Sequence, residues 1–204
     1  KAGGEALELG CGCGGALLPA AFRMPGMRFT GVEIDPEMAS LAEAGVAANG
    51  FQDRVTIETG EASDWVKPHQ NRFDLVFANP PYFESGKISA PGEGKTSAYI
   101  ESLDVSGWVK AMVFAAKPRA PIVLIHRAAE LARILAVMDR QTGEVTVLPL
   151  AAKPGAEAGR VLVRGRKGLK RGPLRLLAPM YTHAADGSPS DVARAVAAGG
   201  AVEW

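Results

Sequence analysis

The sequence has few of the features that mark secreted or membrane proteins. Its 204 residues include only two cysteines, and no apolar run reaches the ~18 residues that a membrane-spanning helix needs. The longest candidate lies between Ala111 and Ile125, where Lys117, Pro118 and Arg119 interrupt it. No secretory signal is recognisable either. We therefore expect a cytoplasmic protein with no membrane partner.

The cysteines and histidines do not suggest a metal or disulfide site. Cys11 and Cys13 are separated by one residue inside a glycine loop, too close for an ordinary disulfide, and no further cysteine completes a zinc site. His69, His126 and His183 are scattered along the chain. We expect no metal, and we interpret the two thiols as small side chains in a tight turn of a protein from a reducing compartment.

Acidic residues are absent from one long segment of the sequence. Residues 1–157 carry 15 basic and 19 acidic side chains, whereas residues 158–185 carry seven basic and no acidic ones. The seven are Arg160, Arg164, Arg166, Lys167, Lys170, Arg171 and Arg175. Such a segment either attracts a polyanion or is a solvated turn, and charge alone does not decide between them.

The order of strands and helices predicts an α/β fold. Apolar runs indicate strands at 5–9, 28–34, 54–58, 73–78, 121–126 and 145–148, alternating with helices at 16–23, 36–49, 105–116 and 128–141. Residues 160–165 and 174–177 flank the basic turn as an expected antiparallel hairpin. We predict a single Rossmann-like domain over residues 1–204, with a mainly parallel twisted sheet and helices on both faces. Because the first residue is not Met and a strand follows almost at once, we expect a segment to precede Lys1.

A glycine loop follows the first strand. Gly10, Gly12, Gly14 and Gly15 let backbone N–H groups and a helix N-terminus approach a ligand. Three of these glycines fit G-x-G-x-x-G, and Glu33 ends the second strand about 20 residues on, where a carboxylate can hold ribose hydroxyls. A dehydrogenase is compatible with these positions.

The tetrapeptide Asn79-Pro80-Pro81-Tyr82 carries the clearest chemistry. It follows the apolar strand 73–78, at the carboxyl end where α/β sheets bind ligands. The Asn79 side-chain oxygen and the Pro80 carbonyl can each accept a hydrogen bond from one N–H group of a planar amino group. The lone pair of its nitrogen is then free to attack a methyl carbon. Tyr82, with Phe83, is placed to stack on a flat substrate.

Glu8 and the following glycines form E-x-G-x-G-x-G, which resembles motif I of class I S-adenosylmethionine (AdoMet) methyltransferases. The resemblance implies that Glu8, Gly10, Gly12 and Gly14 hold the methionine end of AdoMet. It further implies that Glu33 binds the ribose, that Ile34, Glu61 and Ala62 lie at the adenine, and that Asn79 also lines the cofactor pocket. Asp35 is better explained as a helix cap.

The NPPY motif resembles motif IV of methyltransferases that modify adenine N6, cytosine N4 or glutamine N5. Together with the glycine-rich loop and the RVLVRGRKG segment, it resembles the bacterial family of tRNA adenine-N6 methyltransferases that act on valine tRNA. This implies an RNA-binding enzyme of tRNA processing in which Asn79, Pro80 and Tyr82 are catalytic. Substrate contacts then come from Tyr82, Phe83, Arg164, Arg166, Lys167, Lys170 and Arg171. A glutamine-N5 methyltransferase of the release-factor type and a small-molecule methyltransferase remain alternatives.

Overall fold

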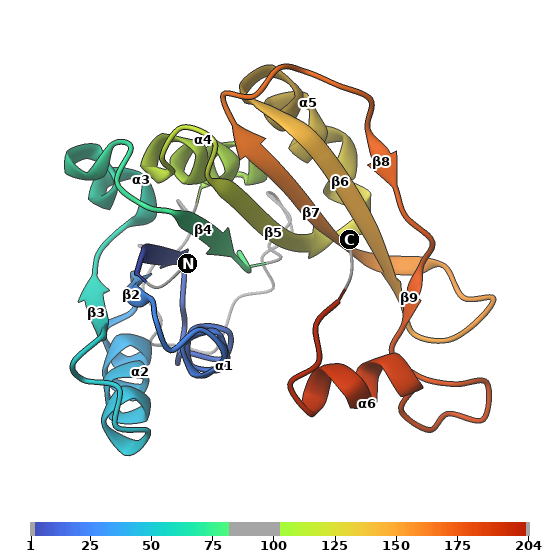
Figure 1. Ribbon diagram of the computed structural model, residues 1–204, viewed down its shortest axis with the longest axis horizontal. Helices are drawn as coiled ribbons and strands as arrows, with labels where there is room; N and C mark the ends of the chain where they lie inside the picture. Colours follow the sequence, from blue (N-terminus) through green and yellow to red (C-terminus); the bar gives the residue numbers. More distant parts are fainter. Residues whose placement is uncertain (1–2, 82–102, 203–204) are drawn as a thin grey trace, which may run out of the picture.

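The computed structural model describes residues 3–81 and 103–202. Within these ranges nine strands form one sheet in the order β3-β2-β1-β4-β5-β7-β6-β8, with β9 also paired to β6 (Figure 1). The parallel strands are β1 (Glu5–Leu9), β2 (Arg28–Glu33), β3 (Val55–Thr59), β4 (Leu75–Ala78) and β5 (Pro121–Arg127). The remaining strands are β6 (Thr142–Ala151), β7 (Ala158–Lys167), β8 (Arg175–Leu176) and β9 (Met180–Tyr181).

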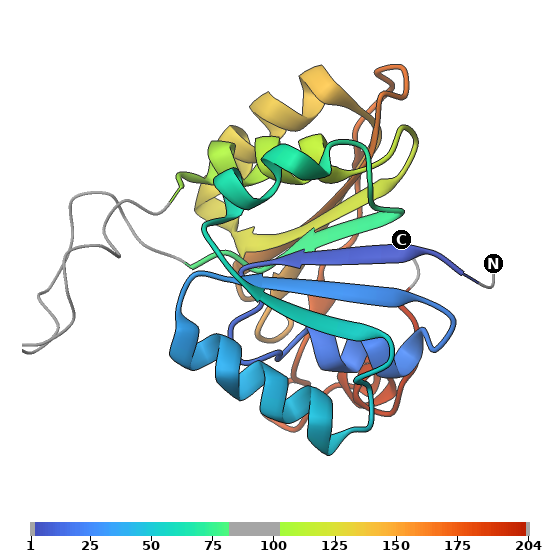
Figure 2. The same ribbon diagram turned by 90° about the vertical axis from the view of Figure 1, so that its left-hand side faces the viewer.

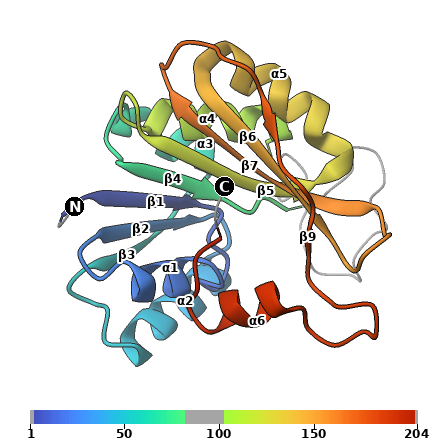
Figure 3. The ribbon, with the colours of Figure 1, turned by 45° about the vertical axis from the view of Figure 1, so that its right-hand side comes forward.

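Helices cover both faces of the sheet. One face carries α1 (Leu17–Arg23), α2 (Pro36–Ala48) and α6 (Asp191–Ala197). The other carries α3 (Ala62–Trp65), α4 (Val105–Ala115) and α5 (Leu131–Gln141), with the short 3-10 turns η1 (Lys67–His69) and η3 (Ala128–Glu130) (Figures 2 and 3). The predicted α/β fold class is therefore confirmed. Among the described residues, no helix is long and apolar enough to cross a membrane.

Two apolar clusters fix the sheet between these layers. The larger one joins β1, β4, β5 and β7 to α4 and α5, and includes the fully buried Phe73, Met112 and Ile134. The smaller one lies under α1 and includes Leu17 and Phe29. Strands buried on both faces need apolar residues at successive positions. Ala6, Leu7 and Leu9 of β1 are fully buried in the interior of the sheet, and Glu8 is the one polar residue among them.

Local capping explains where α2 begins. The Asp35 side chain accepts a hydrogen bond from the Glu37 N–H at 2.9 Å, and Pro36 occupies the first turn, where its missing N–H costs nothing. The predicted cap is confirmed. It fixes the point at which the chain leaves β2, and therefore the position of Glu33.

The C-terminal strand pair differs from the predicted one. β7 lies between β5 and β6 and pairs with both in the antiparallel direction. Because both of its edges are occupied, β8 cannot pair with β7 and instead forms a two-residue parallel ladder with β6. The predicted hairpin of residues 160–165 and 174–177 is therefore wrong, and the antiparallel hairpin is formed by β6 and β7.

Candidate functional site

The carboxyl ends of the parallel strands bring the predicted site residues to one edge of the sheet. Leu9 lies opposite Val32, Glu33 opposite Thr59, and Leu9 also opposite Ala78. The glycine loop, Glu33, Glu61 and Asn79 each follow or end one of these strands. In open α/β sheets this edge, where the strand order reverses beside β1, is where ligands bind.

The glycine loop is held by the neighbouring strand. The N–H groups of Gly10 and Cys11 both donate to the Val32 carbonyl, at 2.8 and 3.0 Å. Gly10, Gly12 and Gly14 all have positive φ, at 68°, 53° and 89°, a region that side chains with a Cβ rarely adopt. A Cβ at Gly10 would lie 2.8 Å from the Trp108 ring, whereas one at Gly12 would meet nothing within 4 Å. Gly10 thus serves packing, and Gly12 faces open space.

Glu33 links the loop to the turn after β2. One carboxylate oxygen accepts from the Gly12 N–H at 2.8 Å, and the other accepts from the Asp35 N–H at 3.0 Å. The residue is 9% exposed. Since a carboxylate has about four acceptor positions, two remain for hydroxyl donors of a ligand.

Glu8 is a carboxyl group inside the sheet. It is 2% exposed, and its Oε2 atom has no hydrogen-bond partner within the part of the chain that the structure describes. Burial raises the pKa of Glu8 to about 8, against an opposing hydrogen bond from the backbone of Leu17 at the start of α1. A buried acceptor without a partner costs ~1–3 kcal/mol, so this oxygen is suited to a ligand's cationic donor.

The residues predicted at an adenine ring occupy two adjacent turns. Ile34 is 46% exposed directly after β2, an unusual position for a large apolar side chain. Glu61 begins α3, and its side chain accepts from the Asp64 N–H at 3.0 Å, while Ala62 is buried behind it. Glu61 therefore also has a local role as a helix cap.

Asn79 and Pro80 leave the end of β4. Asn79 is exposed and Pro80 is buried, so the turn is anchored on one side and open on the other. Ala78 pairs with Leu124, which places Asn79 beside the last residues of β5. The predicted substrate contacts Tyr82 and Phe83 lie outside the described residues.

The structure separates the basic turn from this edge. β7 runs antiparallel to β5, so Arg166 lies opposite Pro121, at the amino end of β5, and Arg160 lies opposite Arg127, at the carboxyl end. Arg166 donates to the Arg119 carbonyl at 2.9 Å, and it also pairs with Glu144. The direction of β7 thus carries residues 166–171 to the edge of the sheet opposite Asn79.

Lys167 has a structural role at that opposite edge. Its ammonium group donates to Asn71 Oδ1 at 2.7 Å and to the carbonyls of Phe114 and Ala116 at 3.2 and 2.9 Å. Partial burial lowers the pKa of Lys167. Arg171, also predicted as a phosphate contact, pairs with Asp139 at 2.7 Å, and Lys170 is exposed beside it.

Sequence reasoning missed Gly31, which lets the glycine loop pack closely. A Cβ at Gly31 would lie 2.7 Å from Leu17 and 2.9 Å from the Cys11 sulfur. The available signal was an isolated glycine inside a predicted strand, which marks close approach of another segment. Burial raises the pKa of the Cys11 thiol to about 12, so this cysteine is inert packing, as predicted.

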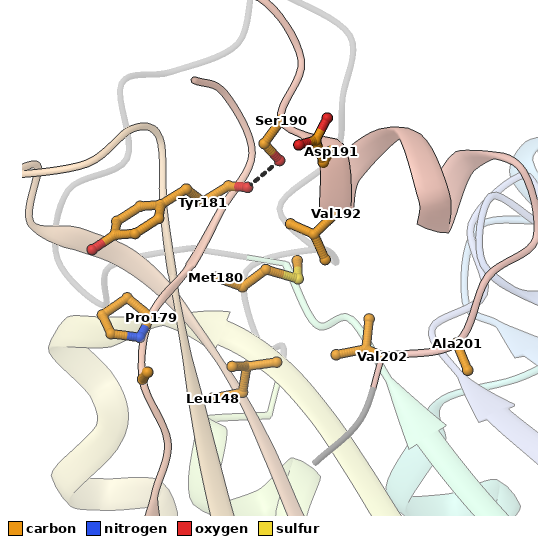
Figure 4. Close-up of a pocket in the computed structure, with 10 residues that line it drawn as sticks. Leu148, Pro179, Met180, Tyr181, Ser190, Asp191, Val192, Ala201 and Val202 are labelled. Atoms are coloured by element: carbon orange, nitrogen blue, oxygen red, sulfur yellow. Dashed lines mark hydrogen bonds between the residues drawn. The ribbon is translucent and has the colours of Figure 1, made fainter. Parts of the chain in front are cut away.

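A separate hollow of about 460 Å³ lies away from these residues. It is bounded by Leu148 of β6, by the segment around β9 and by the start of α6, where Ser190 donates to the Tyr181 carbonyl (Figure 4). Its lining is mainly apolar, and it shares no residue with the glycine loop or the β4 turn.

Comparison with known proteins gives matches over the part of the chain that contains these residues. Residues 6–89, which contain the glycine loop, Glu33 and Asn79, match the family model described as a methyltransferase domain. A solved structure of Atu636 from Agrobacterium tumefaciens, described as a predicted O-methyltransferase, superposes with a TM-score of 0.79 at 20% identity, covering 98% of this chain and 91% of that one. The chain has a class I methyltransferase fold.

Curated proteins that match part of this chain carry a more specific name. The tRNA1(Val) (adenine(37)-N6)-methyltransferase of Porphyromonas gingivalis is 40% identical over 98 residues, which are 47% of this chain and 38% of the relative. The enzyme of the same name from Citrobacter koseri is 33% identical over 99 residues, 48% of this chain and 40% of the relative. The predicted resemblance is confirmed. The match spans about two fifths of the length of these relatives.

Proposed function

We propose that the protein transfers a methyl group from AdoMet to the N6 amino group of an adenine in tRNA. The observation that carries this proposal is the Asn79-Pro80 turn at the carboxyl end of β4, beside a glycine loop of the methyltransferase domain. The names of the curated relatives support the adenine and the tRNA. A tRNA substrate also fits the expected cytoplasmic location.

The polar groups at the edge of the sheet fit AdoMet. The buried Oε2 of Glu8 accepts from the methionine ammonium, directly or through water, and the remaining acceptor positions of Glu33 take the ribose hydroxyls. Gly12 leaves room for the ligand, since a Cβ there would meet no atom within 4 Å. Ile34 lies exposed beside Glu33, where an adenine ring covers it.

In this proposal, the protein's own residues contribute by orienting the adenine amino group that receives the methyl group. AdoMet supplies an electrophilic methyl group when bound. The Asn79 side-chain oxygen and the Pro80 carbonyl accept hydrogen bonds from the two N–H groups of the adenine amino group. These bonds direct the nitrogen lone pair toward that methyl group. Pro80 is buried, so its carbonyl is held in place before the substrate arrives. Fixed dipoles of this kind lower the barrier without a strong base.

Incubation of the full-length protein with labelled AdoMet and separate pools of tRNA, DNA and protein tests the function. We expect label in tRNA, recovered as N6-methyladenosine after digestion. Label recovered as N5-methylglutamine in protein would overturn the adenine assignment and favour the release-factor alternative. An Asn79→Ala variant in the same assay links the label to this site.

A further inference from the structure

Trp108 belongs to the larger apolar cluster, yet it lies at the carboxyl edge of the sheet. α4 connects β4 to β5, and these two strands are parallel, so the helix starts at the edge where β4 ends. The end of α4 lies at the amino edge, where Ala116 forms a bridge with Phe73 just before β4. Because Trp108 is in the first turn of α4, its ring is at the edge where α/β sheets bind ligands.

The ring of Trp108 packs directly on the glycine loop. A Cβ at Gly10 would lie 2.8 Å from the Cη2 atom of the indole and 3.3 Å from its Cζ3 atom. Both atoms belong to the six-membered ring, so this end of the side chain covers the backbone of Gly10. Two residues later, a Cβ at Gly12 would meet no atom within 4 Å. Trp108 therefore borders the part of the loop that has room for a ligand.

The indole N–H of Trp108 is a donor without an acceptor. The residue is 7% exposed, and its nitrogen has no hydrogen-bond partner among the described residues. The nitrogen is not fully enclosed, so a ligand can reach it. A buried tryptophan usually finds a partner for this group, as Trp65 does by donating to Glu58 at 2.7 Å. The N–H of Trp108 is therefore suited to an acceptor that belongs to a ligand.

Glu8 presents the complementary group at the same loop. It precedes Gly10 by two residues, and its buried Oε2 atom is an acceptor without a donor among the described residues. The methionine end of AdoMet carries an ammonium group, which is only a donor, and a carboxylate, which is only an acceptor. One free acceptor and one free donor beside the loop match these two groups, and hydrogen bonds to charged groups are the strong ones.

We propose that the indole N–H of Trp108 donates to the methionine carboxylate of AdoMet, directly or through one water, while Glu8 accepts from the ammonium group. This inference rests on the AdoMet-binding part of the proposed function. It adds a cofactor-binding residue that lies outside residues 6–89, the part of the chain that matches the methyltransferase domain. It also gives the pocket a means to prefer AdoMet over ligands that have the amine but no carboxylate.

Two ligands that differ only in this carboxylate test the assignment. Calorimetry measures the affinity of the full-length protein for AdoMet and for decarboxylated AdoMet, which keeps the amine, the sulfonium and the nucleoside. The ratio of the two affinities is the preference for the carboxylate. We expect Trp108→Phe to reduce this preference by about 10- to 100-fold, the usual effect of losing one hydrogen bond to a charged group. Any loss of packing on Gly10 affects both ligands and cancels in the ratio.

Two further variants serve as controls. Trp65→Phe removes an indole N–H that Glu58 already accepts, and it should keep the wild-type preference. Glu8→Gln should weaken both ligands to a similar degree, because both carry the amine. If Trp108→Phe weakened both ligands equally, or left both unchanged, the assignment would be overturned and Trp108 would be packing on Gly10 alone.

A replacement that conserves the shape of the ring keeps the test decisive if thermal unfolding shows that Trp108→Phe destabilises the fold. Benzothienylalanine incorporated at position 108 keeps the bicyclic ring on Gly10 but has sulfur in place of the N–H. We expect the same loss of preference in this variant. A benzothienylalanine variant with the wild-type preference would show that the N–H does not hold the carboxylate.

The outcomes also separate this inference from the proposed function. Methylation of adenine in tRNA by the wild-type protein, with a preference that does not depend on Trp108, overturns the assignment and leaves the methyl transfer intact. A preference that depends on Trp108, without any methylation of adenine by the wild-type protein, supports the assignment and overturns the proposed function. A wild-type protein that does not bind AdoMet would overturn both.

Discussion

The two edges of the sheet use charged side chains differently. At the amino edge, Lys167 has three oxygen acceptors, and Lys117 pairs with Asp74 at 2.8 Å. At the carboxyl edge, Glu8 is almost fully buried, yet its Oε2 has no partner among the described residues, and Glu33 retains room for further donors. Charges at one edge thus hold the protein together, and charges at the other leave positions for a ligand.

The position of a charged residue at one edge or the other separates structural from functional charges. The local charge composition of the sequence does this less well. The segment 158–185 has the strongest charge in the chain, but its direction in the sheet assigns its members to different edges. Variants at the carboxyl edge are expected to change ligand binding or catalysis with little change in stability. Variants at the amino edge are expected to change stability with little change in binding or catalysis.

Asn79→Ala has the largest expected effect. Losing one preorganised polar contact to the reacting group lowers the single-turnover rate by ~10²–10³-fold, with little change in AdoMet affinity. Rapid-quench assays with saturating tRNA measure the rate, and calorimetry measures AdoMet binding. Asn49→Ala, an exposed change at the end of α2, is the matched control. A rate above a tenth of the wild-type value would contradict the role of Asn79.

Glu33→Ala is expected to weaken AdoMet by about 1.5–3 kcal/mol, the usual contribution of hydrogen bonds to a charged group. The variant loses the ribose acceptor and also the contact that holds the Gly12 N–H. Calorimetric titration checks the loss, and Glu37→Ala removes the same charge from the exposed start of α2 as a control. If both variants bound AdoMet like the wild type, Glu33 would not be the ribose anchor.

Much of the carboxyl edge was predictable because its constraints are local in sequence. A glycine loop after a strand, an acid at the next strand end and a proline pair after a buried strand each occupy a fixed place in a parallel sheet. The cap at Asp35 was also predictable from neighbouring residues. These are the positions that the structure brings together at Leu9, Glu33 and Ala78.

The antiparallel part was less predictable, because strand order there depends on long-range pairing. Only residues 145–148 of β6 were expected as strand, since Gly143 and Pro149 interrupt the pattern, but the strand spans ten residues. Nothing in the segment 160–177 indicates that β6 lies between β7 and β8. The pairing of Arg127 with Arg160 was not predictable for the same reason, because the two residues are 33 positions apart in the sequence.

Lys167→Met is expected to change stability and not catalysis. The variant keeps the aliphatic stem but leaves the Ala116 carbonyl without its Lys167 donor, which costs about 1–3 kcal/mol, whereas the Phe114 carbonyl keeps the Asn71 N–H. Urea unfolding measures this loss, with the exposed Lys170→Met as the control. Methyl transfer per folded molecule should stay close to the wild-type value. A stable variant with weakened RNA binding would show that Lys167 contacts the substrate after all.

The smallest expected effect is a pH dependence set by Glu8. Burial raises the pKa of Glu8 to about 8 from the ordinary value of 4.5, so the group is mostly protonated in the free folded protein at pH 7. Its contribution to stability is therefore fully present below about pH 4.5 and is lost as the pH rises through about 8. A bound ammonium group favours the carboxylate, which lowers the pKa again and releases a proton.

AdoMet affinity should consequently increase between pH 6 and 7.5, by at most about tenfold per pH unit, equivalent to ~1.4 kcal/mol. Calorimetry in two buffers of different ionisation enthalpy counts the released proton. Glu8→Gln has no proton to release at this position, so its binding should be weaker at pH 7.5 and nearly independent of pH. If the wild type released no proton, or if the glutamine variant kept the same slope, Glu8 would not hold the ammonium group, and its buried oxygen would require another explanation.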